Sequence, residues 1–220
     1  MKTINLLLLS TALFLGALAM VFVFVPTEAN MGVIQRIFYF HVPVAWVAFF
    51  AFFITFVAGI IYLVRRNLYW DNVACVSAEI GLIFTTLILI TGSIWARPVW
   101  GVWWTWDARL TASLVLWLIY VSYFIVRAYI SGEERRARFA AVVGIIGFVD
   151  VPVVALAIQF SRTSHPKAVI FEGDLAGSML ATLLLSVAAF TALYLLVMVV
   201  GICIKEDARE VINIREASRE

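Results

Sequence analysis

Long apolar segments alternate with short polar ones along almost the whole chain. A membrane-spanning helix needs about 20 mostly apolar residues, and six stretches reach that length, at about 4–25, 42–64, 73–94, 110–130, 139–160 and 177–204. The first stretch is longer than the roughly 7–15 apolar residues of a secretory signal, so we expect it to be retained as a span. The pattern predicts an all-α integral membrane protein built as a bundle of six transmembrane helices.

Lysine and arginine are unequally shared between the two sets of segments that flank these spans. The richer set holds Lys2, Arg65, Arg66, Arg127, Arg135, Arg136, Arg138, Lys205, Arg209, Arg215 and Arg219, and the opposite set holds Arg36, Arg97, Arg109, Arg162 and Lys167. Cytoplasmic loops carry the excess of basic residues. We therefore expect both termini in the cytoplasm and a multi-pass location in the cytoplasmic (inner) membrane. The short charged cytoplasmic tail over 205–220 alternates in charge, which is typical of a short solvated helix.

Composition agrees with membrane lipid as the solvent and excludes several classes of function. Hydrophobic residues make up 64% of the chain and charged residues 14%, whereas soluble domains carry about 45–50% and about 25%. A net charge of +2 without a block of lysines gives no sign of nucleic-acid binding. Cys75 and Cys203 form no CxxC motif, which argues against thiol redox chemistry and a zinc site. The sequence shows no nucleophile–base arrangement or phosphate loop, so we expect no enzyme.

The segment between the third and fourth spans is rich in tryptophan. The chain has eight tryptophans, and five of them are Trp95, Trp100, Trp103, Trp104 and Trp106. Indole side chains favour the headgroup level of a membrane, so an aromatic belt is one interpretation. A belt spreads its aromatic residues over all helix ends, whereas this cluster occupies one loop on the expected outer face. Because large apolar surface on one exposed face marks a binding site, we favour a binding platform.

The two histidines of the chain, His41 and His165, both fall on the same expected outer face. Each lies close to a proline, which disfavours helix just before it, so we expect both imidazoles at the start of a helix or in a loop. Two imidazoles without further ligands make a poor zinc site. They suffice as axial ligands of haem, in which the porphyrin already supplies four nitrogens to the iron. A structural role for each histidine stays open beside this paired role.

Two arginines and an aspartate complete the candidate site on this face. Arg36 precedes His41 by five residues, and Arg109 follows Asp107 by two. Guanidinium groups bind carboxylates through paired donors, which suits both arginines to the two propionates of haem, with snorkelling to the interface as the alternative. Asp107 is suited to orient Arg109, to hold a backbone turn or, as a structural role, to complement the N-terminus of the fourth helix.

Two carboxylates fall inside predicted spans, Glu79 in the third and Asp150 in the fifth. Charged groups at membrane depth are costly and indicate function by default. Polar contacts between helices explain them equally well. Their roles stay open at this point.

Residues 100–111, with the sequence WGVWWTWDARLT, resemble the tryptophan-rich signature of the haem-handling proteins of cytochrome c biogenesis. With the flanking histidines and six spans, the chain is similar from its second span to its sixth to the haem exporter protein C family, also called cytochrome c maturation protein C. The resemblance implies that His41 and His165 are the axial haem ligands and that the tryptophan loop cradles the macrocycle. It also implies that Arg36 and Arg109 approach the propionates.

The resemblance further implies a cargo and a set of partners. Haem b is expected as cargo at the outer, periplasmic face, from which it passes to a periplasmic haem chaperone, cytochrome c maturation protein E. An ABC-type pair of transporter subunits and a small single-span protein of the maturation complex assist its release. Any ATP hydrolysis then belongs to a partner chain.

Two other functions are compatible with the same residues. A membrane-anchored b-type cytochrome or a quinone oxidoreductase subunit would use both histidines for electron transfer, but such subunits more often bury their haem between helices. A structural scaffold would use the tryptophan loop to dock a protein and would bind no haem. Histidines at helix ends favour a haem that is exposed and released, so the sequence predicts haem handling.

Overall fold

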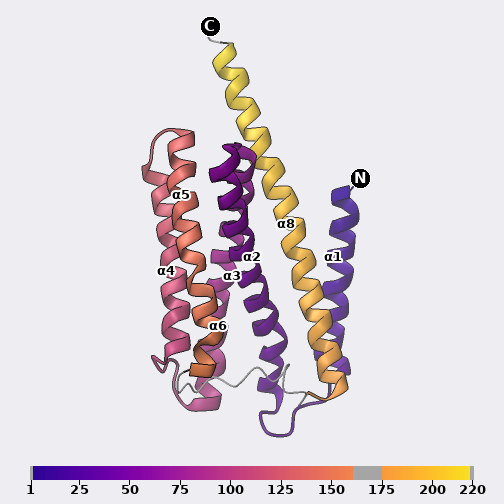
Figure 1. Ribbon diagram of the computed structural model, residues 1–220. Coiled ribbons are helices and arrows are strands. Elements are labelled where there is room, and N and C mark those ends of the chain that lie inside the picture. Colours follow the sequence, from indigo (N-terminus) through magenta and orange to yellow (C-terminus); the bar gives the residue numbers. More distant parts are fainter. Residues whose placement is uncertain (1, 161–174, 219–220) are drawn as a thin grey trace.

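The computed structural model describes residues 2–160 and 175–218, which form long helices joined by short loops (Figure 1). The elements are α1 (Lys2–Ala19), η1 (Met20–Phe24), η2 (Val33–Ile37), α2 (Phe38–Arg65), α3 (Leu68–Trp100), α4 (Ala108–Tyr129), α5 (Glu133–Phe148), α6 (Asp150–Phe160) and α8 (Gly177–Ala217). Within this part of the chain, six helical segments are long and apolar enough to cross a membrane. The prediction of a helical chain with six segments able to span a membrane is confirmed for the described residues.

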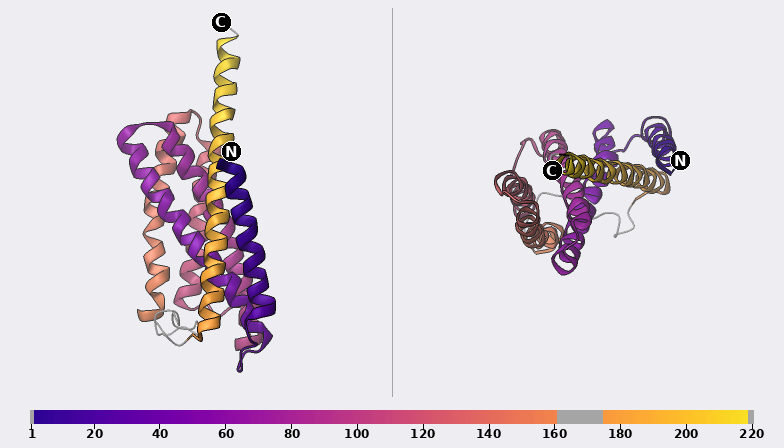
Figure 2. Two further views of the ribbon diagram at one scale, coloured as in Figure 1. Left: turned by 90° about the vertical axis from the view of Figure 1, so that its right-hand side faces the viewer. Right: turned by 90° about the horizontal axis from the view of Figure 1, so that it is seen from above.

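Helix α2 connects the two sides of the bundle. It packs against α3, α5 and α8, while α1 packs along α8, and α4 packs against α5 and α6. Figures 1 and 2 show α1 and α8 together on one side of α2 and α3, with α4, α5 and α6 on the other. Helix α8 extends beyond its neighbours, so the charged tail continues the last span as helix as far as Ala217.

Close packing at the centre fixes α2, α3 and α4 relative to one another. Phe52 of α2 stacks on Tyr120 of α4 with ring centroids 3.6 Å apart. Gly81 of α3 lies directly against the Phe52 ring, which a Cβ atom at this position would overlap. Small residues let membrane helices approach in this way, because lipid supplies no hydrophobic drive between them. These three helices also carry the candidate site.

The fifth span is divided into α5 and α6 by Pro152. Proline lacks an N–H and clashes with the carbonyl four residues before it, here that of Phe148, the last residue of α5. The N–H of Val149, at the break, bonds instead to the carbonyl of Ile146 at 3.1 Å. Asp150 begins α6, and its Oδ2 atom is buried without a hydrogen-bond partner among the described residues.

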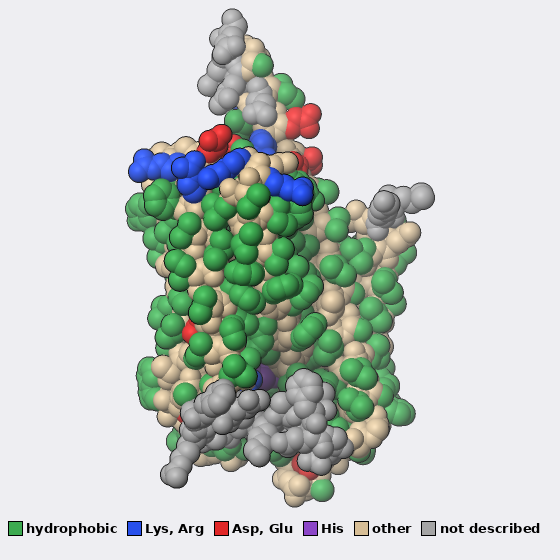
Figure 3. Space-filling model, in the orientation of Figure 1, with side chains coloured by type: hydrophobic (Ala, Val, Ile, Leu, Met, Phe, Trp, Pro, Cys, Tyr) green, Lys and Arg blue, Asp and Glu red, His purple; other side chains and the backbone are tan. Residues whose placement is uncertain are grey.

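The two ends of the bundle differ in their side chains. On the face shown in Figure 3, lysine and arginine gather at the end where both termini lie, and the visible histidine lies near the other end. We call the first the basic end, which includes Arg65, Arg66 and Arg127. We call the second the tryptophan end, which includes Trp100 and Trp104. Arg65, Arg66 and Arg127, which the sequence assigns to one set of segments, thus lie at the same end.

Ion pairs hold the helices together at the basic end. Arg127 of α4 donates two hydrogen bonds to the carboxylate of Asp71 of α3, at 2.6 and 2.8 Å, and both side chains are largely buried. Lys205 of α8 pairs with Glu79 of α3 at 2.9 Å, where both side chains are partly exposed. Glu79 therefore makes a contact between helices, which supports the structural explanation of this carboxylate.

Candidate functional site

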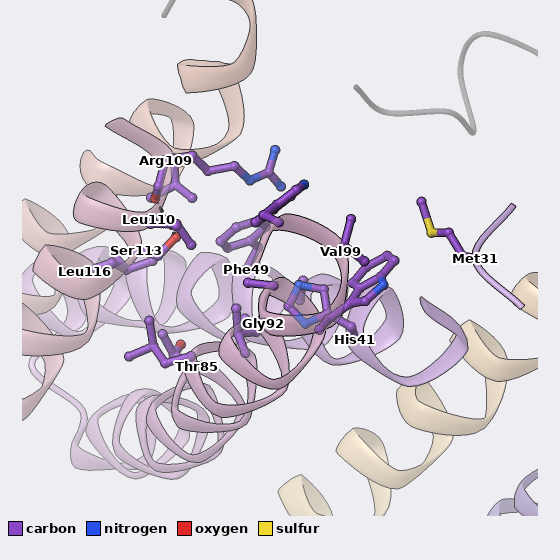
Figure 4. A pocket seen from close by; sticks show the side chains of 17 residues that line it. Met31, His41, Phe49, Thr85, Gly92, Val99, Arg109, Leu110, Ser113 and Leu116 are labelled. Carbon is purple, nitrogen blue, oxygen red and sulfur yellow. Dashed lines mark hydrogen bonds between the residues drawn. The ribbon is translucent and has the colours of Figure 1, made fainter. Parts of the chain in front are cut away.

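A cavity lies between α2, α3, α4 and α6 towards the tryptophan end (Figure 4). Its walls are mostly apolar side chains, among them Phe49, Ile88, Leu116 and Val154. Only a few polar groups interrupt them. An apolar chamber with a small number of polar groups is typical of a site for a small molecule or cofactor.

His41 contributes the imidazole of this cavity. It is the fourth residue of α2, which confirms the expected position at the start of a helix. The residue is only 7% exposed, whereas the sequence favoured an exposed site for histidines at helix ends. The reason is the packing of α3 against this turn, where the His41 Nδ1 atom lies 2.8 Å from the hydroxyl of Thr91. The ring of Trp95 also meets the imidazole edge-on at 5.8 Å.

The structure divides the five clustered tryptophans into two groups. Trp95 and Trp100, near the end of α3, line the cavity. Trp103 and Trp106 lie in the following loop and are 58% and 70% exposed, and Trp104 packs edge-on against Trp106 at 5.7 Å. The cavity pair fits the platform interpretation, whereas the exposed pair also fits an aromatic belt.

The loop after α3 turns sharply and leads directly into α4. Gly101 has a positive φ of 78°, which glycine adopts without strain, and its N–H closes α3 on the carbonyl of Arg97. Trp106 has a φ of 54°, an uncommon value for a bulky residue. Asp107 then caps α4, because its carboxylate accepts hydrogen bonds from the N–H of Leu110 at 3.0 Å and the hydroxyl of Thr105 at 3.1 Å. The structural role expected for Asp107 is confirmed, and a direct role at haem stays a prediction.

The cap places Arg109 in the first turn of α4, where it lines the same cavity as His41. In Figure 4 its side chain extends over the cavity, and the carboxylate of Asp107 interacts electrostatically with its guanidinium. Arg36, in η2, does not line the cavity. Its guanidinium lies over the ring of Phe22, 5.8 Å from the centroid. Of the two arginines predicted to meet the propionates, the structure therefore brings only Arg109 to the cavity.

The second predicted axial ligand, His165, lies outside the described residues, as does the rest of segment 161–174. The described part of the site therefore unites His41, Trp95, Trp100 and Arg109. It does not bring Arg36 or the three tryptophans of the loop to the cavity wall.

Sequence reasoning missed the part of the cavity that comes from helix interiors. Phe49, Thr85, Gly92 and Ser113 line it, yet in the sequence they have the spacing of ordinary core positions. Of these residues, Gly92 could have been identified from the sequence. A glycine inside a helix costs about 1 kcal/mol relative to alanine and often marks a place where two helices approach closely. A Cβ atom at Gly92 would lie 3.3 Å from the Cε1 atom of His41.

Known proteins resemble this chain over most of its length. The family model described as Heme exporter protein C matches residues 2–217. Heme exporter protein C of Bradyrhizobium diazoefficiens is 35% identical over 191 residues, which cover 86% of this chain and 70% of that protein. The protein of the same name from Escherichia coli K12 is 33% identical over 174 residues, covering 78% and 70%.

The similarity extends beyond bacteria. A mitochondrial protein of Marchantia polymorpha, whose name refers to cytochrome c biosynthesis, is 30% identical over 167 residues, covering 75% of this chain and 71% of that protein. The family match includes every described helix and the whole tryptophan end. The predicted resemblance is confirmed, and this multi-pass membrane protein belongs to the Heme exporter protein C family, which handles haem for cytochrome c maturation.

Proposed function

We propose that this protein binds haem b as cargo at its tryptophan end and presents it to a periplasmic haem chaperone, cytochrome c maturation protein E. The observation that carries the proposal is the cavity to which separate helices bring His41, Trp95, Trp100 and Arg109. An imidazole supplies an iron ligand, the indoles supply flat apolar surface, and the guanidinium supplies a donor for a carboxylate. Haem presents the matching groups: an iron for the imidazole, a flat porphyrin for the indoles and propionate carboxylates for the guanidinium.

Donor groups at the cavity match the anionic edge of haem. The Nε1 atom of Trp95 is buried and has no hydrogen-bond partner among the described residues, and the guanidinium of Arg109 belongs to a residue that lines the same cavity. Buried donors without partners cost free energy, which a bound carboxylate would recover. We assign one propionate to Arg109 and the other to Arg36, whose Nε atom is also buried without a described partner.

We assign the iron to His41 on one side and to His165 on the other. The His41 ring is packed against α3, where Thr91 and Trp95 contact it. Trp103, Trp104 and Trp106 extend the apolar surface from the cavity to the exposed rim of the site, and Asp107 holds their loop at the start of α4. The cargo thus has a buried attachment and an exposed edge at which a partner can receive it.

Family membership supports a transport role without chemistry on haem itself. The chain works with an ABC-type pair of transporter subunits and a small single-span protein, and ATP hydrolysis belongs to those partners. The tryptophan end faces the periplasm and the basic end the cytoplasm of a bacterial inner membrane. This orientation is supported by the excess of basic residues in segments such as Arg65–Arg66 and 135–138.

Reporter fusions test the proposed orientation. A reporter that is active only in the cytoplasm is expected to work when it is fused after Arg66 or after Arg138. A reporter that is active only in the periplasm is expected to work when it is placed within 161–175. Reversed activities at these positions would place the haem site on the cytoplasmic side and contradict the proposal.

Haem transfer distinguishes cargo from a resident electron-transfer cofactor. When the purified protein carrying haem b is mixed with the haem-free chaperone, we expect the Soret absorbance to move to the chaperone fraction after separation. A b-type cytochrome or a quinone oxidoreductase subunit would retain its haem and exchange electrons instead. Retention of haem by this chain in the presence of the chaperone and the other maturation proteins would contradict the transfer step.

A further inference from the structure

The hydroxyl of Thr91 determines which nitrogen of His41 carries a proton. The Oγ1 atom of Thr91 lies 2.6 Å from the carbonyl oxygen of Leu87, one turn earlier in α3. Such a distance between two oxygens requires a proton between them, and a threonine hydroxyl has only one to donate. The same Oγ1 lies 2.8 Å from Nδ1 of His41. At that contact the hydroxyl must therefore accept, and Nδ1 must donate.

The tautomer of the imidazole follows from this assignment. In a neutral imidazole one ring nitrogen carries the proton and the other carries the lone pair. With the proton on Nδ1, the lone pair that could bind a metal is on Nε2. His41 lines the cavity and Thr91 does not, so the hydrogen bond holds the ring from outside the cavity wall.

Neighbouring residues of α3 hold the ring in the same orientation. Gly92, next to Thr91, leaves just enough room for the imidazole, since a Cβ atom there would lie 3.3 Å from Cε1 of His41. Trp95, one turn later, meets the ring edge-on with an angle of 67° between the planes. One face of α3 therefore holds the imidazole of His41: Thr91 accepts its hydrogen bond, Gly92 leaves room for the ring and Trp95 packs against it.

We propose that Thr91 is a positioning residue that fixes His41 in the Nδ1–H tautomer and presents Nε2 to the haem iron. The inference rests on the proposed function of His41 as an axial ligand. Histidines that bind metals almost always donate their other ring N–H to a carboxylate, a carbonyl or water, and loss of this partner typically weakens metal binding about 10–100-fold. Here a neutral hydroxyl takes that place.

A neutral acceptor suits a site that must release its cargo. A carboxylate partner would draw the Nδ1 proton more strongly and make Nε2 a more basic ligand. The Thr91 hydroxyl orients the ring but adds no charge, so it leaves His41 an ordinary neutral ligand. The hydrogen bond can therefore orient the imidazole without making it bind the iron more tightly.

Titration of the purified full-length protein with ferric haem b tests the role of Thr91. Thr91→Val keeps the shape of the side chain and removes the hydroxyl, and we expect it to bind haem about 10–100-fold more weakly. We also expect a changed electron paramagnetic resonance spectrum of the bound ferric haem, because the ligand ring is no longer held. Thr91→Ser keeps the hydroxyl, and it is expected to restore both the affinity and the spectrum.

Ser93→Ala is the matched control. Its hydroxyl also donates to a carbonyl one turn earlier, that of Leu89 at 2.8 Å, but Ser93 does not line the cavity. We expect wild-type affinity and spectrum from this variant. If Thr91→Val matches the wild type in both while His41→Ala loses haem, the role of Thr91 is refuted and the haem site stands. If His41→Ala also retains haem, the proposed function itself fails.

Discussion

Replacing His41 with alanine is expected to lower the haem that copurifies with the protein about tenfold or more. The change removes the imidazole that lines the cavity, and each 1.4 kcal/mol of lost binding free energy corresponds to a factor of ten in affinity. The haem that remains is expected to show altered α/β bands, because one axial ligand is missing. The measurement is the ratio of Soret to protein absorbance, together with the haem content of the purified sample.

His165→Ala is expected to give a similar loss if the two histidines bind one iron. Both variants are expected to reach wild-type abundance in the membrane, since neither change shortens an apolar span, and this shows that any loss of haem is not a loss of protein. Thr86→Val serves as a control for the loss of a contact between helices, because Thr86 accepts a hydrogen bond from Nε1 of Trp117 at 2.8 Å and does not line the cavity. Wild-type absorbance bands in both histidine variants would refute the axial assignment.

The fold could be predicted from the sequence because its main determinants are local. Six runs of apolar residues long enough to span a bilayer leave few alternatives to a helical bundle. The break between α5 and α6 also follows from a single residue, Pro152. The alternating charges after Lys205 also indicate a helix, and the structure shows helix as far as Ala217, continuous with the last span.

His41, Trp95, Trp100 and Arg109 were all predicted as site residues and line the cavity, but their placement relative to one another could be predicted only where they are close together in the sequence. Trp95, Trp100 and Arg109 flank one loop, so their proximity follows from the loop itself. The contact of His41 with Thr91 depends instead on which faces of α2 and α3 meet and in which register. Composition and periodicity do not determine that register, which is why the burial of His41 was missed.

The division of the tryptophans is likewise a consequence of tertiary structure. In the sequence all five belong to one cluster, but α3 ends at Trp100 and the chain turns at Gly101. Indoles before the turn follow the helix and line the cavity, whereas Trp103 and Trp106 after it reach the exposed end of the bundle. The sequence therefore predicts a cluster of indole rings but does not determine which of them line the cavity.

This division predicts that the two groups of tryptophans contribute unequally to haem affinity. Leucine at both Trp95 and Trp100 keeps apolar bulk but removes the flat rings of the cavity wall. Aromatic pairs contribute about 0.5–1.5 kcal/mol each beyond their buried area. We therefore expect the double variant to lose about 1–3 kcal/mol of binding free energy, or about 5- to 150-fold in affinity for haem b. Titration of the purified variant, with thermal unfolding to check its fold, provides the measurement.

Leucine at both Trp103 and Trp104 is expected to have a smaller effect, because Trp103 is largely exposed and neither ring lines the cavity. Trp70→Leu, near the start of α3 at the basic end, should leave haem binding unchanged and is the control. If the Trp103 and Trp104 variant keeps all its haem but becomes unstable in the membrane, those rings act as an interfacial anchor. If the Trp95 and Trp100 variant keeps wild-type affinity, the indoles of the cavity wall do not contact the porphyrin, and their assignment to the haem site is refuted.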